Sequence, residues 1–405
     1  MNLLIVSQYF FPENFRINDL ALGLLERGHQ VTVLTGLPNY PEGQFFAGYG
    51  WGGPWRESWA GIEIIRSPML ARGQSKKQLA LNYLSFAALG SLRAMFSCRQ
   101  PFDAVFVYGP SPITAVLPAI ALKKMTGAPL HYWVQDLWPD SLTSGGGITN
   151  PKIIEPVRKL SRWIYDQCDF LLLSSQSFKE RLLEMGQASD KLLYFPQWAE
   201  ADFTNSTARL NPSELAELPP GFRILYAGNI GEAQGFETLL EAATRLKDRP
   251  EIQWIILGGG RKAEWVAEEV TRRGLQSCFH LLGRKPLEQM PAYFKEADCL
   301  LVSLKSDPLN AMTLPAKVQA YMAFGAPILA ALEGEGAQVV LESGAGMVAD
   351  SGNAEQLAQQ ALALAGLDEA RRKAMGKAGV TYAKQHFDRD QLLSWLETQL
   401  ARRSG

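Results

Sequence analysis

The chain has 405 residues, a formal net charge of −1 and four widely spaced cysteines, so its length favours two domains and its charge argues against a nucleic-acid-binding protein. The cysteine spacing fits neither a disulfide framework nor a zinc site and favours a cytosolic protein with reduced thiols. The first residues lack the basic start and long apolar run of a signal peptide.

The first half of the chain alternates short apolar runs with helical patterns. The first helical pattern is clear, because Ile17, Leu20 and Leu24 share one face before Gly28 ends it. The predicted strands of this half are residues 3–6, 30–35, 62–66, 104–108, 130–134 and 170–174. Apolar strands separated by helices are typical of a parallel sheet with helices on both faces, the doubly wound α/β fold.

The most apolar helical segment spans residues 79–96, with basic residues around it from Lys76 to Arg99. Asn82 and Arg93 interrupt it, so we do not expect it to cross a membrane. Two interpretations stay open. The segment is either a helix packed in the domain, which we favour, or a surface helix that docks on anionic lipid.

Residues 199–221 break the alternation with asparagine, proline and glycine, and we expect a linker there. The strands predicted after it are residues 223–227, 254–257, 279–282, 299–303 and 328–332, and the helices are 236–246 and 263–273. We therefore predict two Rossmann-like domains, residues 1–200 and 201–385, which face each other across a ligand-binding cleft. A last helix in residues 386–405 could reach back to the first domain.

The segment Pro315-Ala316-Lys317 precedes a short helical stretch that Gly325 and Pro327 end. Lys317 therefore lies in the first turn of a helix, where the helix dipole favours anions over cations. A lysine at this position is best explained by a bound phosphate.

Three glycine-rich turns each follow a predicted strand of the second half, at residues 228–231, 258–262 and 283–286. Glycine lets backbone N–H groups come close to a diphosphate. Each turn alone also fits an ordinary tight turn or a loop with solvated charges. Together with Lys317 they predict a nucleotide diphosphate ligand at this edge of the sheet.

The order of these motifs resembles the donor-binding half of family-4 glycosyltransferases of the two-domain GT-B type. The motifs are residues 226–231, 234–235, 239–242, 258–260, 282–284 and 315–327. The first half is similar to the same family in residues 6–13, 26–29 and 31–35. Residues 134–140 resemble the branch that builds bacterial surface polysaccharides, including N-acetyl-fucosamine transferases and colanic acid biosynthesis glycosyltransferases.

The resemblance implies a retaining glycosyltransferase (EC 2.4) that transfers a hexosyl or N-acetylhexosaminyl group from a nucleotide sugar, a UDP-sugar being expected. The sugar could be an N-acetylated 6-deoxyhexose, and the acceptor would be a lipid-linked saccharide for O-antigen, lipopolysaccharide, capsule or exopolysaccharide. Such an enzyme needs no side-chain nucleophile and would lie in the cytoplasm, peripherally attached to the inner face of the cell membrane. No metal is expected, since the chain has no paired Asp-x-Asp and its histidines are scattered.

The chain departs from the family at four positions that usually carry charge. Asn229 and Gln234 stand where most members have an arginine and a lysine, and Met312 and Ala320 stand where they have glutamates. Either the chain is a degenerate scaffold or, as we favour, Lys317 is the main phosphate cation, with Arg261 or Lys262 in reserve. The candidate donor-binding residues are Asn229, Gly231, Gln234, Gly258, Arg261, Arg284, Pro315, Ala316, Lys317 and Gln319, the last for part of the ribose contact.

The first domain offers candidates for the acceptor side. Asp136 follows a strand and could orient or deprotonate an acceptor hydroxyl, or else cap the turn into Trp138. Arg16 could bind phosphate or acceptor, or form a salt bridge in the first helical turn. The candidate catalytic residues are Asp136, Lys317 and Glu13, and the candidate acceptor or sugar residues are Asn14, Arg16, Gln135 and Trp138. Trp51, Trp55 and Trp59 could form an aromatic cluster that stacks on sugar or lipid, or pack in the core.

Two other functions stay open. A non-hydrolysing nucleotide-sugar 2-epimerase shares the architecture and the donor, but it would release a free epimer without an acceptor. The missing charges also suit a non-catalytic nucleotide-sugar-binding subunit.

Overall fold

The computed structural model describes residues 1–144, 147–199 and 208–402, and the chain divides into two compact units. Unit 1 consists of Met1–Pro196 and Asp390–Gly405, and unit 2 consists of Gln197–Arg389. The boundary predicted between residues 200 and 201 lies outside the described residues. The return to unit 1 falls at Asp390, a few residues after the predicted 386.

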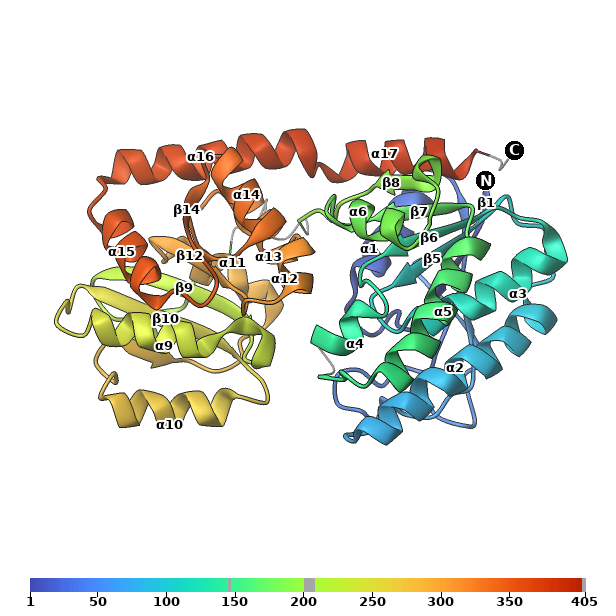
Figure 1. Cartoon of the computed structure of the whole chain (residues 1–405), viewed down its shortest axis with the longest axis horizontal. Helices are drawn as coiled ribbons and strands as arrows, with labels where there is room; N and C mark the ends of the chain where they lie inside the picture. Colours follow the sequence, from blue (N-terminus) through green and yellow to red (C-terminus); the bar gives the residue numbers. More distant parts are fainter. Residues whose placement is uncertain (145–146, 200–207, 403–405) are drawn as a thin grey trace. The chain divides into compact units, whose positions relative to one another are not determined.

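Unit 1, whose strands run from blue to green in Figure 1, is built on an eight-stranded sheet with the order β3-β4-β2-β1-β5-β6-β7-β8. The strands are β1 (Asn2–Ser7), β2 (Gln30–Thr35), β3 (Arg56–Trp59), β4 (Ile62–Arg66), β5 (Ala104–Gly109), β6 (Leu130–Val134), β7 (Phe170–Leu173) and β8 (Leu192–Tyr194). Neighbouring strands are parallel except β3 and β4, which pair antiparallel. The sequence does not predict β3 or β8, because β3 is a polar, partly exposed edge strand and β8 has only three residues.

Helices cover this sheet and connect its strands. They are α1 (Arg16–Glu26), α2 (Lys76–Ser97), α3 (Leu117–Thr126), α4 (Asp140–Ser144), α5 (Pro151–Gln167), α6 (Phe178–Glu184) and α17 (Arg389–Leu400), with 3₁₀ turns η1 (Ile113–Val116) and η2 (Ser189–Lys191). Helix α17 belongs to unit 1, although it follows unit 2 in the chain. Trp395 stacks on Phe195 with ring centroids 5.6 Å apart, and His29 Nε2 lies 2.7 Å from Glu397 Oε1.

Helix α2 buries one face and exposes the other. Asn82 and Phe86 are buried, and the Gln8 amide donates to Asn82 Oδ1 at 2.7 Å. One face of the helix is thus packed in unit 1 and the other is exposed, so both interpretations stay open. Contrary to the argument from Asn82 and Arg93, α2 is long and apolar enough to cross a membrane by length and composition alone, a test that core helices of soluble proteins also pass.

Unit 2 contains an all-parallel six-stranded sheet with the order β11-β10-β9-β12-β13-β14. The strands are β9 (Phe222–Asn229), β10 (Ile252–Gly259), β11 (Phe279–Leu281), β12 (Cys299–Ser303), β13 (Ile328–Ala331) and β14 (Gly346–Ala349). The helices are α8 (Pro212–Ala216), α9 (Phe236–Arg245), α10 (Ala263–Arg273), α11 (Met290–Lys295), α12 (Pro308–Met312), α13 (Ala316–Phe324), α14 (Gly334–Glu342), α15 (Ala354–Ala365) and α16 (Glu369–His386), with 3₁₀ turns η3 (Glu232–Gln234) and η4 (Leu287–Gln289).

Successive residues of β9 enter two different cores. Ile224 and Tyr226 belong to the core that includes α9 and α15, whereas Leu225 belongs to the core that includes α13 and α11. A strand buried on both faces in this way is what the continuous apolar run predicts. Both units are therefore Rossmann-like, and the predicted doubly wound α/β fold is confirmed.

Helix α13 begins at Ala316, with Pro315 as its N-cap rather than within the first turn. Gly325 ends the helix with φ 88°, in the left-handed region that glycine tolerates. The predicted order of loop, helix, turn and strand is correct, and Lys317 lies in the first turn.

Candidate functional site

Lys317 reaches from α13 to the carboxyl end of β9. Its Nζ lies 3.8 Å from the centroid of the Tyr226 ring. No carboxylate among the described residues forms an ion pair with it, and burial lowers the pKa of Lys317 to about 7. The aromatic face compensates part of the lost hydration, but an anion beside the amine would restore its charged form.

Gly228 makes room for this lysine at the end of β9. A Cβ at Gly228 would lie 2.6 Å from Lys317 Nζ. On the neighbouring strand a Cβ at Gly258 would lie 1.8 Å from the carbonyl oxygen of Gly228. Glycine at 258 is therefore required by the packing of two strand ends, and this requirement is independent of any ligand.

The turn after β9 holds the two amides that replace the usual cations. The Asn229 amide donates to Gln234 Oε1 at 3.3 Å, and Gly231 lies directly against the Asn229 side chain. The structure thus brings Asn229, Gly231 and Gln234 together in one turn. A ligand here would meet amides and backbone groups.

The two reserve cations differ in their availability. Lys262 forms ion pairs with Glu232 at 2.8 Å and with Glu237, so its charge is already compensated. Arg261 is exposed after β10. Arg284 is also exposed and lies beside Gly259, where a Cβ would be 2.8 Å from Arg284 Nε.

Gln319 does not belong to this site. It is 1% exposed, and its amide donates to the carbonyl oxygen of Gln197 at 2.8 Å. Two residues along a helix from Lys317, a side chain points to nearly the opposite side. The predicted ribose contact is therefore wrong, whereas the Ala316 position is exposed at the helix start.

In unit 1, Asp136 lies just beyond the carboxyl end of β6. Burial raises the pKa of Asp136 to about 7. Its carboxylate forms no ion pair or hydrogen bond with the described residues. The backbone N–H of Trp138 donates instead to Tyr165 Oη at 3.3 Å. Asp136 therefore does not cap the turn, and its raised pKa suits a general base near neutral pH.

Glu13 has a structural use that the sequence did not indicate. Its Oε1 accepts hydrogen bonds from the backbone N–H groups of Asn39 and Tyr40, at 2.8 and 2.7 Å. Burial raises the pKa of Glu13 to about 7, and these hydrogen bonds oppose the rise. The contacts favour loop organisation over catalysis for Glu13. Its neighbour Asn14 is exposed.

Arg16 is the first residue of α1, and its charge acts on the buried Tyr108 hydroxyl at the end of β5. Burial raises the pKa of Tyr108, and the Arg16 guanidinium opposes this. The charges of Arg16 and Asp136 thus shift the pKa of the same tyrosine in opposite directions, and this tyrosine lies at the carboxyl edge of the sheet.

The tryptophans singled out from the sequence differ in their exposure. Trp138 is 8% exposed and Gln135 is 9% exposed, so both lie in the interior. Trp51 is exposed, whereas Trp59 stacks on Phe11 with centroids 4.5 Å apart. Trp59 therefore packs within unit 1, and a role of the exposed Trp51 in stacking on sugar or lipid stays a prediction.

Three residues that the sequence did not single out also lie at this edge of unit 1, namely Tyr9, Arg72 and Tyr83. Arg72 Nη1 donates to Tyr9 Oη at 3.1 Å, and charges on Arg72 and Asp136 both act on the Tyr83 hydroxyl. Only Tyr9 stood within a recognised motif. Arg72 follows β4 and Tyr83 lies on α2, so no local pattern connects them.

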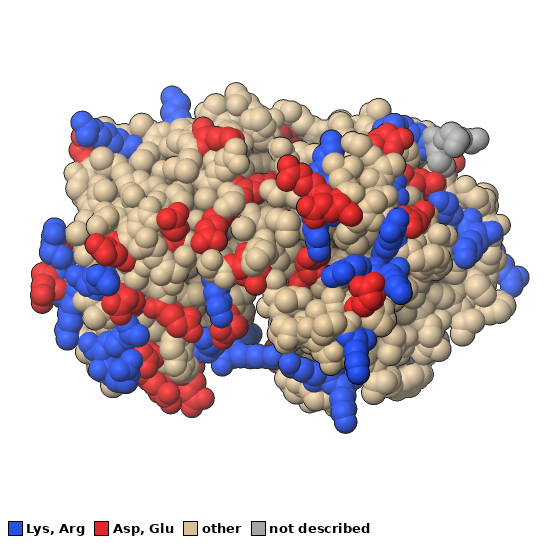
Figure 2. All heavy atoms as spheres, in the orientation of Figure 1, with Lys and Arg blue, Asp and Glu red and all other residues tan. Residues whose placement is uncertain are grey.

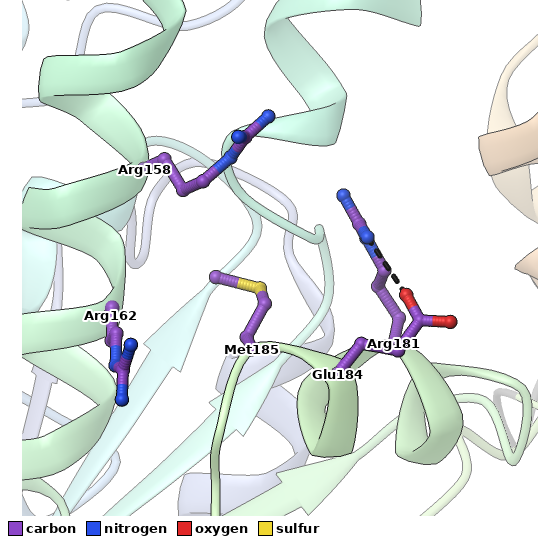
Figure 3. A pocket seen from close by; sticks show the side chains of 5 residues that line it. All are labelled: Arg158, Arg162, Arg181, Glu184 and Met185. Carbon is purple, nitrogen blue, oxygen red and sulfur yellow. Dashed lines mark hydrogen bonds and ion pairs between the residues drawn. The ribbon is translucent and has the colours of Figure 1, made fainter.

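A hollow of unit 1 lies between α5 and α6 (Figure 3). It is lined by Arg158, Arg162, Arg181, Glu184 and Met185. Arg181 pairs with Asp140 at 2.8 Å and with Glu184 at 2.9 Å. Among the described residues no group of three or more His, Cys, Asp or Glu could hold a metal ion.

The chain is similar to known glycosyltransferases. Residues 14–198 match the family described as Glycosyl transferase 4-like domain, and residues 221–366 match Glycosyl transferases group 1. The chain is 28% identical over 343 residues to the colanic acid biosynthesis glycosyl transferase WcaI of Escherichia coli, covering 80% of this chain and 82% of that protein. It is 26% identical over 216 residues to the amylovoran biosynthesis glycosyltransferase AmsK of Erwinia amylovora, 53% of this chain and 52% of AmsK.

Solved structures agree on the fold. HepE from Anabaena, in complex with UDP, has a TM-score of 0.71 at 14% identity, covering 99% of this chain and 100% of HepE. WaaG, a glycosyltransferase involved in lipopolysaccharide biosynthesis, has a TM-score of 0.68 at 14% identity, covering 99% of both chains. At this identity the likeness establishes the GT-B fold.

Proposed function

We propose that this chain, which has the GT-B fold and matches glycosyltransferase families over residues 14–198 and 221–366, transfers a sugar from a UDP-sugar to a lipid-linked saccharide in surface polysaccharide synthesis. The names of WcaI and AmsK, which concern colanic acid and amylovoran, support this assignment. The observation that carries the proposal is Lys317, an amine without a carboxylate partner among the described residues. A donor diphosphate would supply the missing anion.

Lys317 would act on the leaving group. Breaking the sugar–phosphate bond develops negative charge on the diphosphate, and a positioned cation stabilises that charge. The first N–H groups of α13 and the turn after β9 would add backbone donors. Arg284 and Arg261 would contact the donor from the exposed rim. The Asn229 and Gln234 amides would replace the usual cations by hydrogen bonds.

Asp136 would act on the acceptor. In the retaining mechanism that we propose, the acceptor hydroxyl attacks from the same face as the leaving group, whose oxygen takes the proton. Asp136 would orient that hydroxyl, with Arg16 and Asn14 as further contacts of the acceptor. We propose an N-acetylated 6-deoxyhexose as the transferred sugar, from the resemblance of residues 134–140 to N-acetyl-fucosamine transferases.

Helix α2 would attach unit 1 to the membrane. Leu81, Leu84, Leu92 and Phe96 form a stripe along one face of α2, each between 49% and 63% exposed. We call these four residues the α2 stripe. Lys76, Lys77 and Arg99 flank it, and Figure 2 shows a broad area without charged side chains over this part of unit 1. An apolar stripe with basic ends fits the cytoplasmic face of an anionic membrane.

A reaction panel tests the proposal against its alternatives. The protein is incubated with a series of nucleotide sugars, with and without a bacterial lipid extract. The transferase predicts a glycosylated lipid only when the extract is present. A free 2-epimer formed without the extract would favour the epimerase instead, and no product under either condition would favour a non-catalytic subunit.

A further inference from the structure

Arg72 is a cation of unit 1 without a role in the proposed transfer reaction. Its Nη1 donates to Tyr9 Oη at 3.1 Å, and its guanidinium carbon lies 5.3 Å from the centroid of the Tyr40 ring. Its backbone N–H donates to Asn39 Oδ1 at 2.8 Å. None of the carboxylates in the described ranges pairs with it. Arg72 is therefore held in place by neutral groups while its charge stays uncompensated.

Arg72 lies in the same cluster as Asp136. The Tyr83 hydroxyl is acted on by the charges of both residues, so it lies near each of them. The cluster is fixed by Asn82, which donates to the Leu70 carbonyl oxygen at 2.6 Å and thereby ties α2 to the Arg72 loop. An anion bound at Arg72 would therefore lie close to the proposed acceptor residue.

The same turn of α2 also carries exposed apolar side chains. Asn82 is buried and Tyr83 reaches the cluster, whereas Leu81 and Leu84 are 52% and 60% exposed. A molecule with an anionic head and an apolar tail could contact the cluster and the α2 stripe together. A guanidinium suits a phosphate head, because its fork of N–H donors matches two phosphate oxygens.

We propose that Arg72 binds the phosphate that joins lipid to saccharide in the acceptor, while the isoprenoid chain follows the α2 stripe. This inference rests on the proposed function, since it presumes a lipid-linked acceptor. It assigns the acceptor class as a lipid phosphate or diphosphate. It also assigns Arg72 as the residue that recognises the phosphate.

Binding of a soluble mimic tests the assignment. Farnesyl diphosphate, farnesol and inorganic pyrophosphate are titrated into the full chain, with affinity measured by calorimetry. We expect farnesyl diphosphate to bind more tightly than either farnesol or pyrophosphate, because only it offers both parts. Arg72→Gln should weaken farnesyl diphosphate binding by about tenfold or more, since a hydrogen-bonded charge contributes that much, and should leave farnesol binding unchanged.

The matched control is Arg158→Gln, which removes an exposed arginine from the hollow between α5 and α6 of the same unit. It should leave farnesyl diphosphate binding within twofold, about the error of the measurement. Equal weakening by both variants, or loss only in Arg158→Gln, would overturn the proposal. Leu84→Gln should weaken both farnesol and farnesyl diphosphate but not pyrophosphate. If Arg72→Gln does not fold, Arg72→Lys keeps the charge without the fork and should give an intermediate loss, whereas wild-type affinity in it would refute fork recognition.

UDP binding separates this inference from the proposed function. We expect Arg72→Gln to bind UDP as the wild type does, and Lys317→Ala to lose UDP affinity while keeping farnesyl diphosphate. Arg72-dependent farnesyl diphosphate binding without any UDP binding would sink the donor proposal and leave the phosphate site standing. Normal UDP binding with Arg72-independent farnesyl diphosphate binding would refute the inference alone.

Discussion

Each unit places an ionisable group beside the carboxyl ends of parallel strands, and burial drives both groups towards neutrality. In unit 2 burial lowers the pKa of Lys317 to about 7, and in unit 1 it raises the pKa of Asp136 to about 7. Neither side chain has an ion-pair partner among the described residues. An added anion would therefore stabilise the charged form of the lysine. A hydroxyl or a cationic centre would stabilise the charged form of the aspartate.

The two edges are also built differently. The edge of unit 2 consists of turns that directly follow strands and one helix start, so each of its segments carries its own local sequence signal. The edge of unit 1 collects Tyr9, Arg72, Tyr83 and Asp136 from four separate segments. Experiments that treat the two edges separately will show whether one serves the leaving group and the other serves the acceptor.

The largest effect is expected from Lys317→Ala. Removing the cation that faces the leaving diphosphate should lower kcat by about 10² to 10³, as for other preorganised charge-stabilising groups. Release of UDP from the donor in the presence of acceptor measures this. The control is Lys373→Ala, an exposed lysine on α16 whose loss should change nothing measurable. Near-normal turnover of Lys317→Ala would break the assignment of unit 2 to the leaving group.

A somewhat smaller effect is expected from Asp136→Asn. The amide keeps the shape but removes the carboxylate that orients the acceptor hydroxyl, and a misplaced reacting group costs about 10² in rate. If unit 1 serves the acceptor, Asp136→Asn should bind the donor as the wild type does, and titration with UDP tests this. Asp190→Asn, at an exposed position of unit 1, is the control. If Asp136→Asn lost UDP affinity and turnover equally, the division of labour between the units would be wrong.

Membrane attachment should depend on unit 1 alone. Each lysine near an anionic surface contributes about 1 kcal/mol, so Lys76→Gln combined with Lys77→Gln should weaken vesicle binding about thirtyfold. Sedimentation with phosphatidylserine-containing vesicles at low salt measures this. The matched double variant Lys373→Gln with Lys377→Gln changes the same charge in unit 2 and should bind like the wild type. Unchanged binding of the α2 variant would remove the docking role.

The mildest test is the pH profile of kcat/KM. Above about pH 7 the Lys317 amine loses its proton in the free protein, so the donor-dependent rate should fall as pH rises. Below about pH 7 the Asp136 carboxyl gains a proton, so the acceptor-dependent rate should fall as pH decreases. The expected profile is a bell centred near neutrality, with up to about tenfold loss per pH unit on either side. In Lys317→Arg the alkaline limb should disappear, because arginine stays charged. An alkaline limb that persists in that variant would assign it to another group.

Much of unit 2 could be predicted because its information is local. The helix that contains Lys317 was read from Pro315 and Gly325, and the glycine turns from residues next to each strand. The orientation of the Gln319 side chain could not be predicted in this way. The sequence predicts it at the ligand, but its amide donates to the carbonyl oxygen of Gln197. Strand β14 was also not predicted, because four residues that begin with glycine carry little apolar signal.

The sequence by itself determined the two doubly wound sheets, and it suggested the glycosyltransferase resemblance and the phosphate role that we propose for Lys317. Apolar runs, turn residues and caps act over a few residues, and they specify strands and helices directly. Only the tertiary structure decided that Arg72, Tyr83 and Asp136 share one edge of unit 1, that Glu13 organises the Asn39 loop, and that Trp138 is buried. Those facts depend on how segments far apart in the sequence pack together and on which charged side chains are buried away from water. No local sequence pattern encodes tertiary packing or burial of this kind.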